Sequence, residues 1–217
     1  MSDDEVDRAA RQAIIDACRR MNALGINQGT SGNVGLRAGD GLLVTPTSLP
    51  YDAMEPADIV RLAMDGTPTG RRRPSSEWRF HRDILQAMPH VDAVVHAHPP
   101  ASTTLAILGR GIPPLHYMVA AAGGADIRCA PYATFGTAEL SAHAVAALQG
   151  RKACLLAHHG MIATGASLAQ ALWLAVEVET LARQYLGCLQ AGIEPPLLSE
   201  AEIDAVIAKM AGYGHAT

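Results

Sequence analysis

The chain alternates between stretches in which apolar residues recur at every third or fourth position and stretches in which they form short continuous runs. The first spacing is that of an amphipathic helix. It predicts helices over residues 2–24, 75–88, 101–108, 137–148, 167–190 and 199–210. The motifs Ser2-x-x-Glu5, Ser167-x-x-Gln170 and Ser199-x-x-Glu202 have the form of capping boxes, and a threonine at 137 is a suitable N-cap. Four of the six helices therefore begin at a recognisable residue.

The short apolar runs, bounded by Gly, Pro or Asp, are typical of β-strands. They cover residues 34–37, 42–45, 58–64, 92–98, 127–130 and 152–157. Gly39-Asp40-Gly41 joins the first two runs as a hairpin, whereas helices separate several of the later ones. This mixture of connections predicts a mixed sheet covered by helices. Because no repeat, linker or change in composition marks a boundary, we expect one α/β domain over residues 1–217.

Charge and hydropathy narrow the classes of protein. The formal net charge of −4 gives no basic surface for nucleic acid. The basic run Arg71-Arg72-Arg73 lies between Gly and Pro, where we interpret it as a solvated surface patch rather than a polyanion site. No apolar run reaches the roughly 18 residues of a membrane helix, and the acidic start argues against a signal peptide. The four cysteines lack CxxC spacing, which predicts free thiols in a reducing cytoplasm.

His96-Ala97-His98 ends a predicted strand and is the first candidate for chemistry. Side chains at i and i+2 of a strand leave the same face about 6–7 Å apart. Both imidazoles can therefore bind one metal ion, for which the zinc–nitrogen distance is about 2.0–2.1 Å. The alternative interpretation is a pair of hydrogen-bonded or solvated histidines with no metal.

A third ligand is available in His158-His159, at the end of the predicted strand 152–157. Neighbouring strand residues point to opposite faces, so we expect only one of the two to join His96 and His98. The spacing does not decide which. Three histidines with one open position are the ligand set of a catalytic rather than a structural zinc ion.

Ser75-Ser76-Glu77 opens a predicted helix, and two interpretations fit it. The free N–H groups and two hydroxyls suit a phosphate, with a carboxylate beside them to act as a base. Alternatively a serine caps the helix and Glu77 complements its dipole. The small polar runs 27–33 and 45–48 are similarly compatible with ligand loops or with plain connections.

Together these motifs resemble the class II, zinc-dependent aldolases of the L-fuculose-phosphate aldolase type over nearly the whole chain. The matching segments are Asn27-Gln28-Gly29-Thr30-x-Gly32-Asn33-Val34, Thr45-Pro46-Thr47, Pro74-Ser75-Ser76-Glu77-Trp78-Arg79-Phe80-His81, Val94-Val95-His96-x-His98, residues 112–124, residues 129–137 and His158-His159-Gly160. The resemblance implies a three-layer sandwich with a mixed, largely antiparallel central sheet, and a homotetramer with four-fold (C4) symmetry whose active sites lie between subunits.

The resemblance also implies a role for individual residues. Zinc would be held by His96, His98 and His159, with Glu77 nearby as general acid/base. Phosphate would be bound by Gly32, Asn33, Thr47, Ser48, Ser75 and Ser76. Tyr117 from a neighbouring subunit would protonate the departing aldehyde oxygen, and Phe135 and Tyr213 would line the aldehyde end. Ser48 and Gly35 depart from the family pattern, and a side chain at 48 would either crowd the phosphate or add a hydroxyl donor.

The implied reaction is cleavage of the C3–C4 bond of a ketose 1-phosphate to dihydroxyacetone phosphate and a short aldehyde. Zinc replaces a Schiff-base lysine in such chemistry, and Lys152 and Lys209 lie outside the matching motifs. L-Fuculose, 5-deoxyribulose and 5-methylthioribulose 1-phosphates are the candidate sugars. The alternatives are an epimerase, dehydratase or decarboxylase on the same scaffold, a zinc hydrolase, which needs no phosphate loops, and an adducin-like binding module, which lacks the histidines.

Overall fold

The computed structural model describes residues 3–211, and the predicted cap at Ser2 and the expected pocket residue Tyr213 lie outside the described residues. Within this range the strands form one sheet in the order β4-β3-β2-β1-β5-β8-β7-β6. They are β1 (Asn33–Ala38), β2 (Gly41–Val44), β3 (Val60–Ala63), β4 (Pro68–Thr69), β5 (Ala93–Ala97), β6 (Arg128–Ala130), β7 (Ala153–Leu156) and β8 (Gly160–Gly165). Only the described pair β6–β7 is parallel, which confirms the mixed, largely antiparallel sheet.

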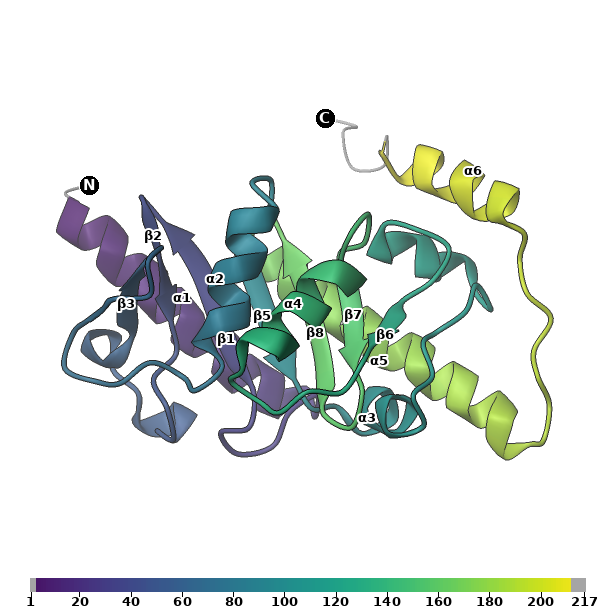
Figure 1. Ribbon diagram of the computed structural model, residues 1–217, viewed down its shortest axis with the longest axis horizontal. Helices are drawn as coiled ribbons and strands as arrows, with labels where there is room; N and C mark the ends of the chain where they lie inside the picture. The colour runs from purple at the N-terminus through teal and green to yellow at the C-terminus, as the bar shows by residue number, and fades with distance from the viewer. Residues whose placement is uncertain (1–2, 212–217) are drawn as a thin grey trace.

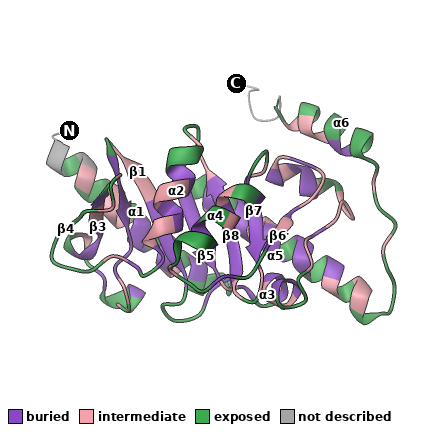
Figure 2. Cartoon of the chain, viewed as in Figure 1, coloured by how far each residue is buried: buried purple, intermediate pink, exposed green. Residues whose placement is uncertain are grey.

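Helices cover both faces of the sheet, so the predicted three layers are confirmed (Figure 1). The first group comprises α1 (Asp3–Ala23), α3 (Pro100–Ile107) and α5 (Leu168–Gln190), and the second comprises α2 (Trp78–Ala87) and α4 (Ala138–Ala147). Two apolar cores result, one around Ile14, Leu105 and Val178 and the other around Phe80 and Leu140. Figure 2 shows the central strands β5, β7 and β8 buried between these layers, whereas β4 at one end of the sheet is exposed.

The last helix, α6 (Glu200–Ala211), stands apart from the layers at the end of an extended connection (Figure 1). It packs against η3 (Tyr117–Ala122), a 3₁₀ helix, and buries Ile203. No helix among residues 3–211 is long and apolar enough to span a bilayer.

The central strand β5 positions the candidate site because every one of its residues is buried. Successive side chains point to opposite faces, so Val95 and Ala97 enter one core while Val94 enters the other. His96 shares the face of Val94, and its ring lies 5.2 Å from that of Phe80 on α2. Burial on both faces explains why this strand has a continuous apolar sequence rather than an alternating one.

Three local predictions need correction. Helix α2 begins at Trp78 with Glu77 as its N-cap and no side-chain capping bond, so neither Ser75 nor Ser76 caps it. The turn predicted at His158-His159-Gly160 leads into β8, a strand that the apolar pattern did not predict. Its run of four residues between two glycines offers too few positions to establish a period. The strand predicted over 58–64 is confined to β3, because η2 (Pro56–Asp58) precedes it.

The run of arginines is exposed, as expected, but two of its members are paired. Arg71 Nε and Arg72 Nε donate to the buried Asp58 Oδ1 at 2.9 and 2.7 Å. Burial raises the pKa of Asp58, but the hydrogen bonds from the two arginines outweigh that effect and lower the pKa to about 2. The pairing anchors the loop that leads to Ser75.

The predicted free cysteines are confirmed, since all four are free thiols.

Candidate active site

Three histidines from two neighbouring strand ends gather at one edge of the sheet. His96 is on β5, His98 follows that strand directly, and His159 lies in the turn between β7 and β8. One ring nitrogen from each lies within 4.8 Å of the others, and the Nε2 atoms of His96 and His98 are 2.9 Å apart. The pairing of β5 with β8 brings the third histidine beside the other two.

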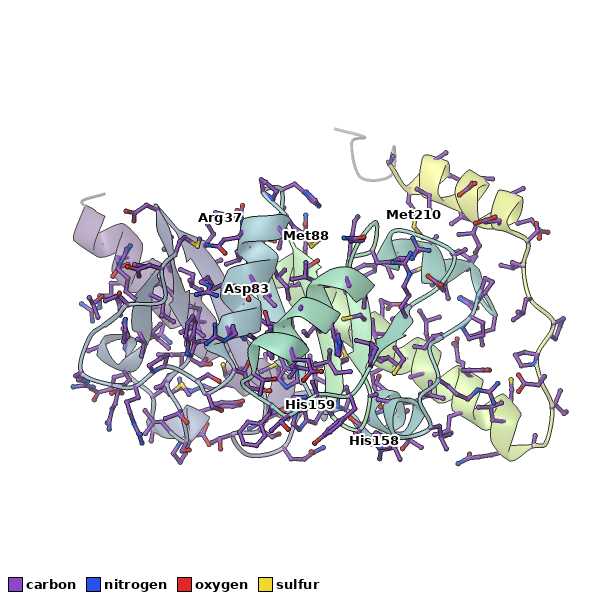
Figure 3. All side chains as sticks on the ribbon, viewed as in Figure 1. Arg37, Asp83, Met88, His158, His159 and Met210 are labelled. Atoms are coloured by element: carbon purple, nitrogen blue, oxygen red, sulfur yellow. The ribbon has the colours of Figure 1, made fainter. Side chains whose placement is uncertain are left out.

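His159, and not His158, joins the group, as the family resemblance implied. The ring of His159 lies 4.8 and 5.0 Å from those of His96 and His98. His158 adopts a left-handed backbone with φ of 56°, and the centroid of its exposed ring lies 5.9 Å from that of Tyr132. Both His158 and His159 are labelled in Figure 3. This conformation turns the chain between the two strands, so the two adjacent histidines have different surroundings.

The nitrogen atoms are suited to bind a metal ion because they carry lone pairs. His96 Nδ1 lies 2.9 Å from the carbonyl oxygen of Met161, so Nδ1–H donates there and Nε2 is left as an acceptor. Burial, together with the nearby His96 and His159, lowers the pKa of His98 to about 3, so that this ring is neutral at pH 7. Ring nitrogens that converge on one point in this way form a site that a divalent cation would stabilise.

Glu77 completes the site from the start of α2. Its Oε2 lies 3.2 Å from His96 Nε2, and its Oε1 lies 3.2 Å from His159 Nε2. Burial raises the pKa of Glu77, but the charges of the two imidazoles lower it well below the usual range, which keeps the group ionised. Oε1 is buried and, apart from this contact with His159, accepts no hydrogen bond. Such an orphaned oxygen is costly, and a cation held by the histidines would satisfy it, so the residues fit a metal ion.

The residues expected to bind phosphate come from three segments that the fold holds together. They are Gly32, Asn33, Thr47, Ser48, Ser75 and Ser76. Thr47 N donates to Arg73 O at 3.1 Å, and Ser75 N donates to Thr45 O at 2.8 Å. The segment 45–48 therefore runs beside the segment 73–76. Thr45 N donates to Val34 O at 3.1 Å and links them to the first. Asn33 is directly opposite His96 in the sheet, which places this polar group next to the histidines.

Ser48 has a backbone conformation that its residue type disfavours. Its φ is 57°, in the left-handed region, and its side chain is exposed. A serine there carries a Cβ that glycine would not. Its hydroxyl lies 3.4 Å from that of Thr47, so both hydroxyls are presented at the same loop tip.

Two expected site residues lie on the surface. Tyr117 begins η3, is half exposed and contacts His116 with ring centroids 4.7 Å apart. No hydrogen bond or ring contact within residues 3–211 joins Tyr117 to the three histidines. Phe135 is 63% exposed. Its loop nevertheless borders the phosphate segments, because a Cβ on the following glycine would lie 2.7 Å from Ser76 O.

Two supporting residues were not singled out from the sequence. His81 Nε2 lies 2.5 Å from Asn33 Oδ1, and Asn33 in turn contacts Glu77. Glu179, buried on α5, accepts hydrogen bonds from the backbone N–H groups of Ala101 and Ser102 at 3.1 and 2.9 Å. It thereby anchors the start of α3, directly after the histidine pair. An acidic residue within the apolar stripe of a long helix is the signal that would have revealed it.

The protein is therefore an α/β protein whose mixed sheet brings three histidines and a buried glutamate together. This arrangement is able to hold a metal ion. The model of the family "Class II Aldolase and Adducin N-terminal domain" matches residues 12–186. The chain therefore belongs to the class II aldolase and adducin family, and the resemblance drawn from the motifs is confirmed.

Similar proteins cover almost the entire chain. A relative from Rhodospirillum rubrum, named 5-methylthioribulose-1-phosphate/5-deoxyribulose-1-phosphate aldolase, is 59% identical over 95% of this chain and 93% of its own length. L-Fuculose phosphate aldolase of Escherichia coli K12 is 51% identical over 97% of each chain. A solved structure of L-fuculose 1-phosphate aldolase matches with a TM-score of 0.91 at 34% identity, over 94% of this chain and 96% of the other.

Proposed function

We propose that this chain cleaves the C3–C4 bond of a ketose 1-phosphate to dihydroxyacetone phosphate and a short aldehyde, using a zinc ion held by His96, His98 and His159. Relatives at 59% and 51% identity are named aldolases, so the chain is a lyase. The observation that carries the site assignment is that three imidazole nitrogens lie within 4.8 Å of one another, with the buried Glu77 carboxylate 3.2 Å from two of them.

The proposed mechanism depends on where charge develops. A bound zinc ion would supply Lewis-acid stabilisation for the negative charge that carbon–carbon cleavage leaves on the substrate. Glu77 transfers a proton to or from C3 as the general acid/base, a role that contributes about 10²–10⁴-fold. Its Oε1 is the oxygen available for this transfer, since Oε2 already accepts a hydrogen bond from Asn33 Nδ2 at 2.9 Å.

The phosphate is held, in this proposal, by the three linked polar segments. Ser75, Ser76, Thr47 and Ser48 offer hydroxyl groups, and the backbone at Gly32 allows close approach. Gly32 must lack a side chain, because a Cβ there would lie 2.6 Å from His96 O. The loops hold the phosphate while the histidine edge of the sheet faces the reacting carbons, which orients the substrate.

A neighbouring subunit completes the proposed site. Tyr117 is exposed and lies apart from the histidines of its own chain, which supports a role for it in the site of an adjacent copy. There it protonates the departing aldehyde oxygen, while Phe135 and Tyr213 line the aldehyde end. This arrangement requires the homo-oligomer, a C4 tetramer, that the family resemblance implied, and the enzyme acts in the cytoplasm.

The experiment that tests this function is release of dihydroxyacetone phosphate from L-fuculose, 5-deoxyribulose and 5-methylthioribulose 1-phosphates, each offered to zinc-loaded protein. We expect release from at least one sugar, loss of activity with a chelator and recovery with zinc. The sugars differ beyond C4, where one methyl or thioether group discriminates by only about 1–3 kcal/mol, so kcat/KM must be compared across all three. Absence of release from every sugar would refute the assignment.

A further inference from the structure

A buried hydrogen-bonded chain leads from α2 through β1 to the carboxylate of Glu77. His81 Nε2 lies 2.5 Å from Asn33 Oδ1, and Asn33 Nδ2 donates to Glu77 Oε2 at 2.9 Å. His81 is fully buried, one turn of helix after Glu77, and both Asn33 and Glu77 are also buried. Because all three side chains are buried, each polar atom has few alternative orientations.

The direction of every hydrogen bond in this chain follows from the orientation of the Asn33 amide. Asn33 presents its NH₂ group to Glu77 Oε2 and its carbonyl oxygen to His81 Nε2. That carbonyl in turn requires a proton on His81 Nε2. His81 is therefore the neutral Nε2–H tautomer, and burial, which lowers its pKa to about 3, keeps it neutral at pH 7.

The other ring nitrogen of His81 is consistent with this tautomer. Nδ1 is buried and has no hydrogen-bond partner, which costs less for a bare lone pair than for an N–H group. It faces Gly35 on β1, where an added Cβ would lie only 2.7 Å from Nδ1. The missing side chain at 35, one of the departures from the family pattern, thus gives the imidazole its space.

We propose that His81 is a positioning residue that acts through Asn33 to hold Oε2 of Glu77 and leave Oε1 directed at the reacting atoms. The inference rests on the proposed function of Glu77 as acid/base. If Asn33 were free to rotate its amide, its oxygen would face the carboxylate and repel it. The donor at His81 Nε2 excludes that rotamer, so the geometry of the carboxylate depends on a residue that touches no substrate.

A matched pair of variants separates positioning from packing. His81→Gln places an amide nitrogen near the position of Nε2, whereas His81→Asn places it near Nδ1, too far from Asn33. Both are polar and uncharged. We expect His81→Asn to lower kcat about tenfold with KM changed less than about twofold, and His81→Gln to restore most of kcat. In an Asn33→Ala background, His81→Asn should cause no further loss, because the coupling runs through the amide.

A second readout uses no substrate. In metal-free protein labelled with ¹⁵N-histidine, NMR should show His81 as the Nε2–H tautomer across neutral pH, with its signal shifted by Asn33→Ala. Equal kcat losses in His81→Gln and His81→Asn, additive losses in the double variant, or the Nδ1–H tautomer would each overturn the inference. A wild-type protein that releases no dihydroxyacetone phosphate from any sugar would refute the proposed function. The results named above, obtained with an active wild-type protein, would refute only the role of His81.

Discussion

Replacing Ser48 by glycine tests the conformation of the loop that presents the hydroxyls proposed to bind phosphate. Ser48 adopts a φ of 57°, which costs a residue with a Cβ about 1–2 kcal/mol. Glycine removes that cost but loses about 0.5–1 kcal/mol of additional chain entropy on folding. The net expectation is a stabilisation of about 0.5–1 kcal/mol in Ser48→Gly, equivalent to a Tm higher by about 1–4 °C.

The matched control is Ser48→Ala, which removes the same hydroxyl but retains the Cβ and its strain. Urea unfolding monitored by circular dichroism, at one protein concentration, gives the free energy of unfolding of each variant. Ser48→Gly should exceed Ser48→Ala by about 1 kcal/mol. Equal stabilities of the two variants would refute the strain that we assign to this position.

The same two variants separate strain from phosphate recognition. The hydroxyl is exposed and lies 3.4 Å from that of Thr47, so the loop tip offers two donors. If the Ser48 hydroxyl binds phosphate, both variants raise KM by a similar factor, about 5- to 10-fold, with little change in kcat. A lower KM in Ser48→Gly alone would show instead that the Cβ crowds the phosphate.

The remaining predictions concern the metal site and a remote ion pair. His159→Asn should lose most bound zinc, whereas His158→Asn should retain it. His158 lies outside the group of three histidines, and asparagine tolerates its left-handed φ of 56°. Metal analysis of both proteins checks this, and the reverse order would mean that the wrong histidine has been assigned. Glu77→Gln should bind zinc yet lower kcat by about 10²–10⁴-fold, and near-normal turnover would contradict its role as acid/base. Asp58→Asn should lower the free energy of unfolding by about 1–2 kcal/mol at pH 7, after allowance for solvent screening of its arginines. Because the folded pKa of Asp58 is lowered to about 2, this stabilisation is complete above the unfolded pKa of about 4 and disappears as the pH falls towards 2, so the two proteins should converge in acid urea titrations.

The sequence predicted the elements whose periodicity is long or whose boundaries carry a signal. Capping boxes at Ser167 and Ser199 mark the starts of α5 and α6 to within one residue. Strand β8 was missed because its short apolar run between two glycines matches no single period, and its identity as a strand depends on pairing with β5 and β7. Helix α2 begins after the predicted serines because their segment pairs with the loop at Thr45 instead of entering the helix.

The candidate site was predictable in its residue types but not in its connections. The spacing of His96 and His98 indicated one face of a strand, whereas the choice between His158 and His159 needed the left-handed turn that the structure shows. The link from His81 through Asn33 joins residues far apart in the sequence, and no local pattern reveals such a contact.

Titration of zinc into chelator-treated protein tests the central claim most directly. Activity towards the preferred ketose 1-phosphate should be absent without metal and rise linearly to a plateau at one zinc ion per chain, and the same titration of His159→Asn should give no plateau at that ratio. Full release of dihydroxyacetone phosphate by metal-free protein, or a plateau unaffected by loss of His159, would contradict the account.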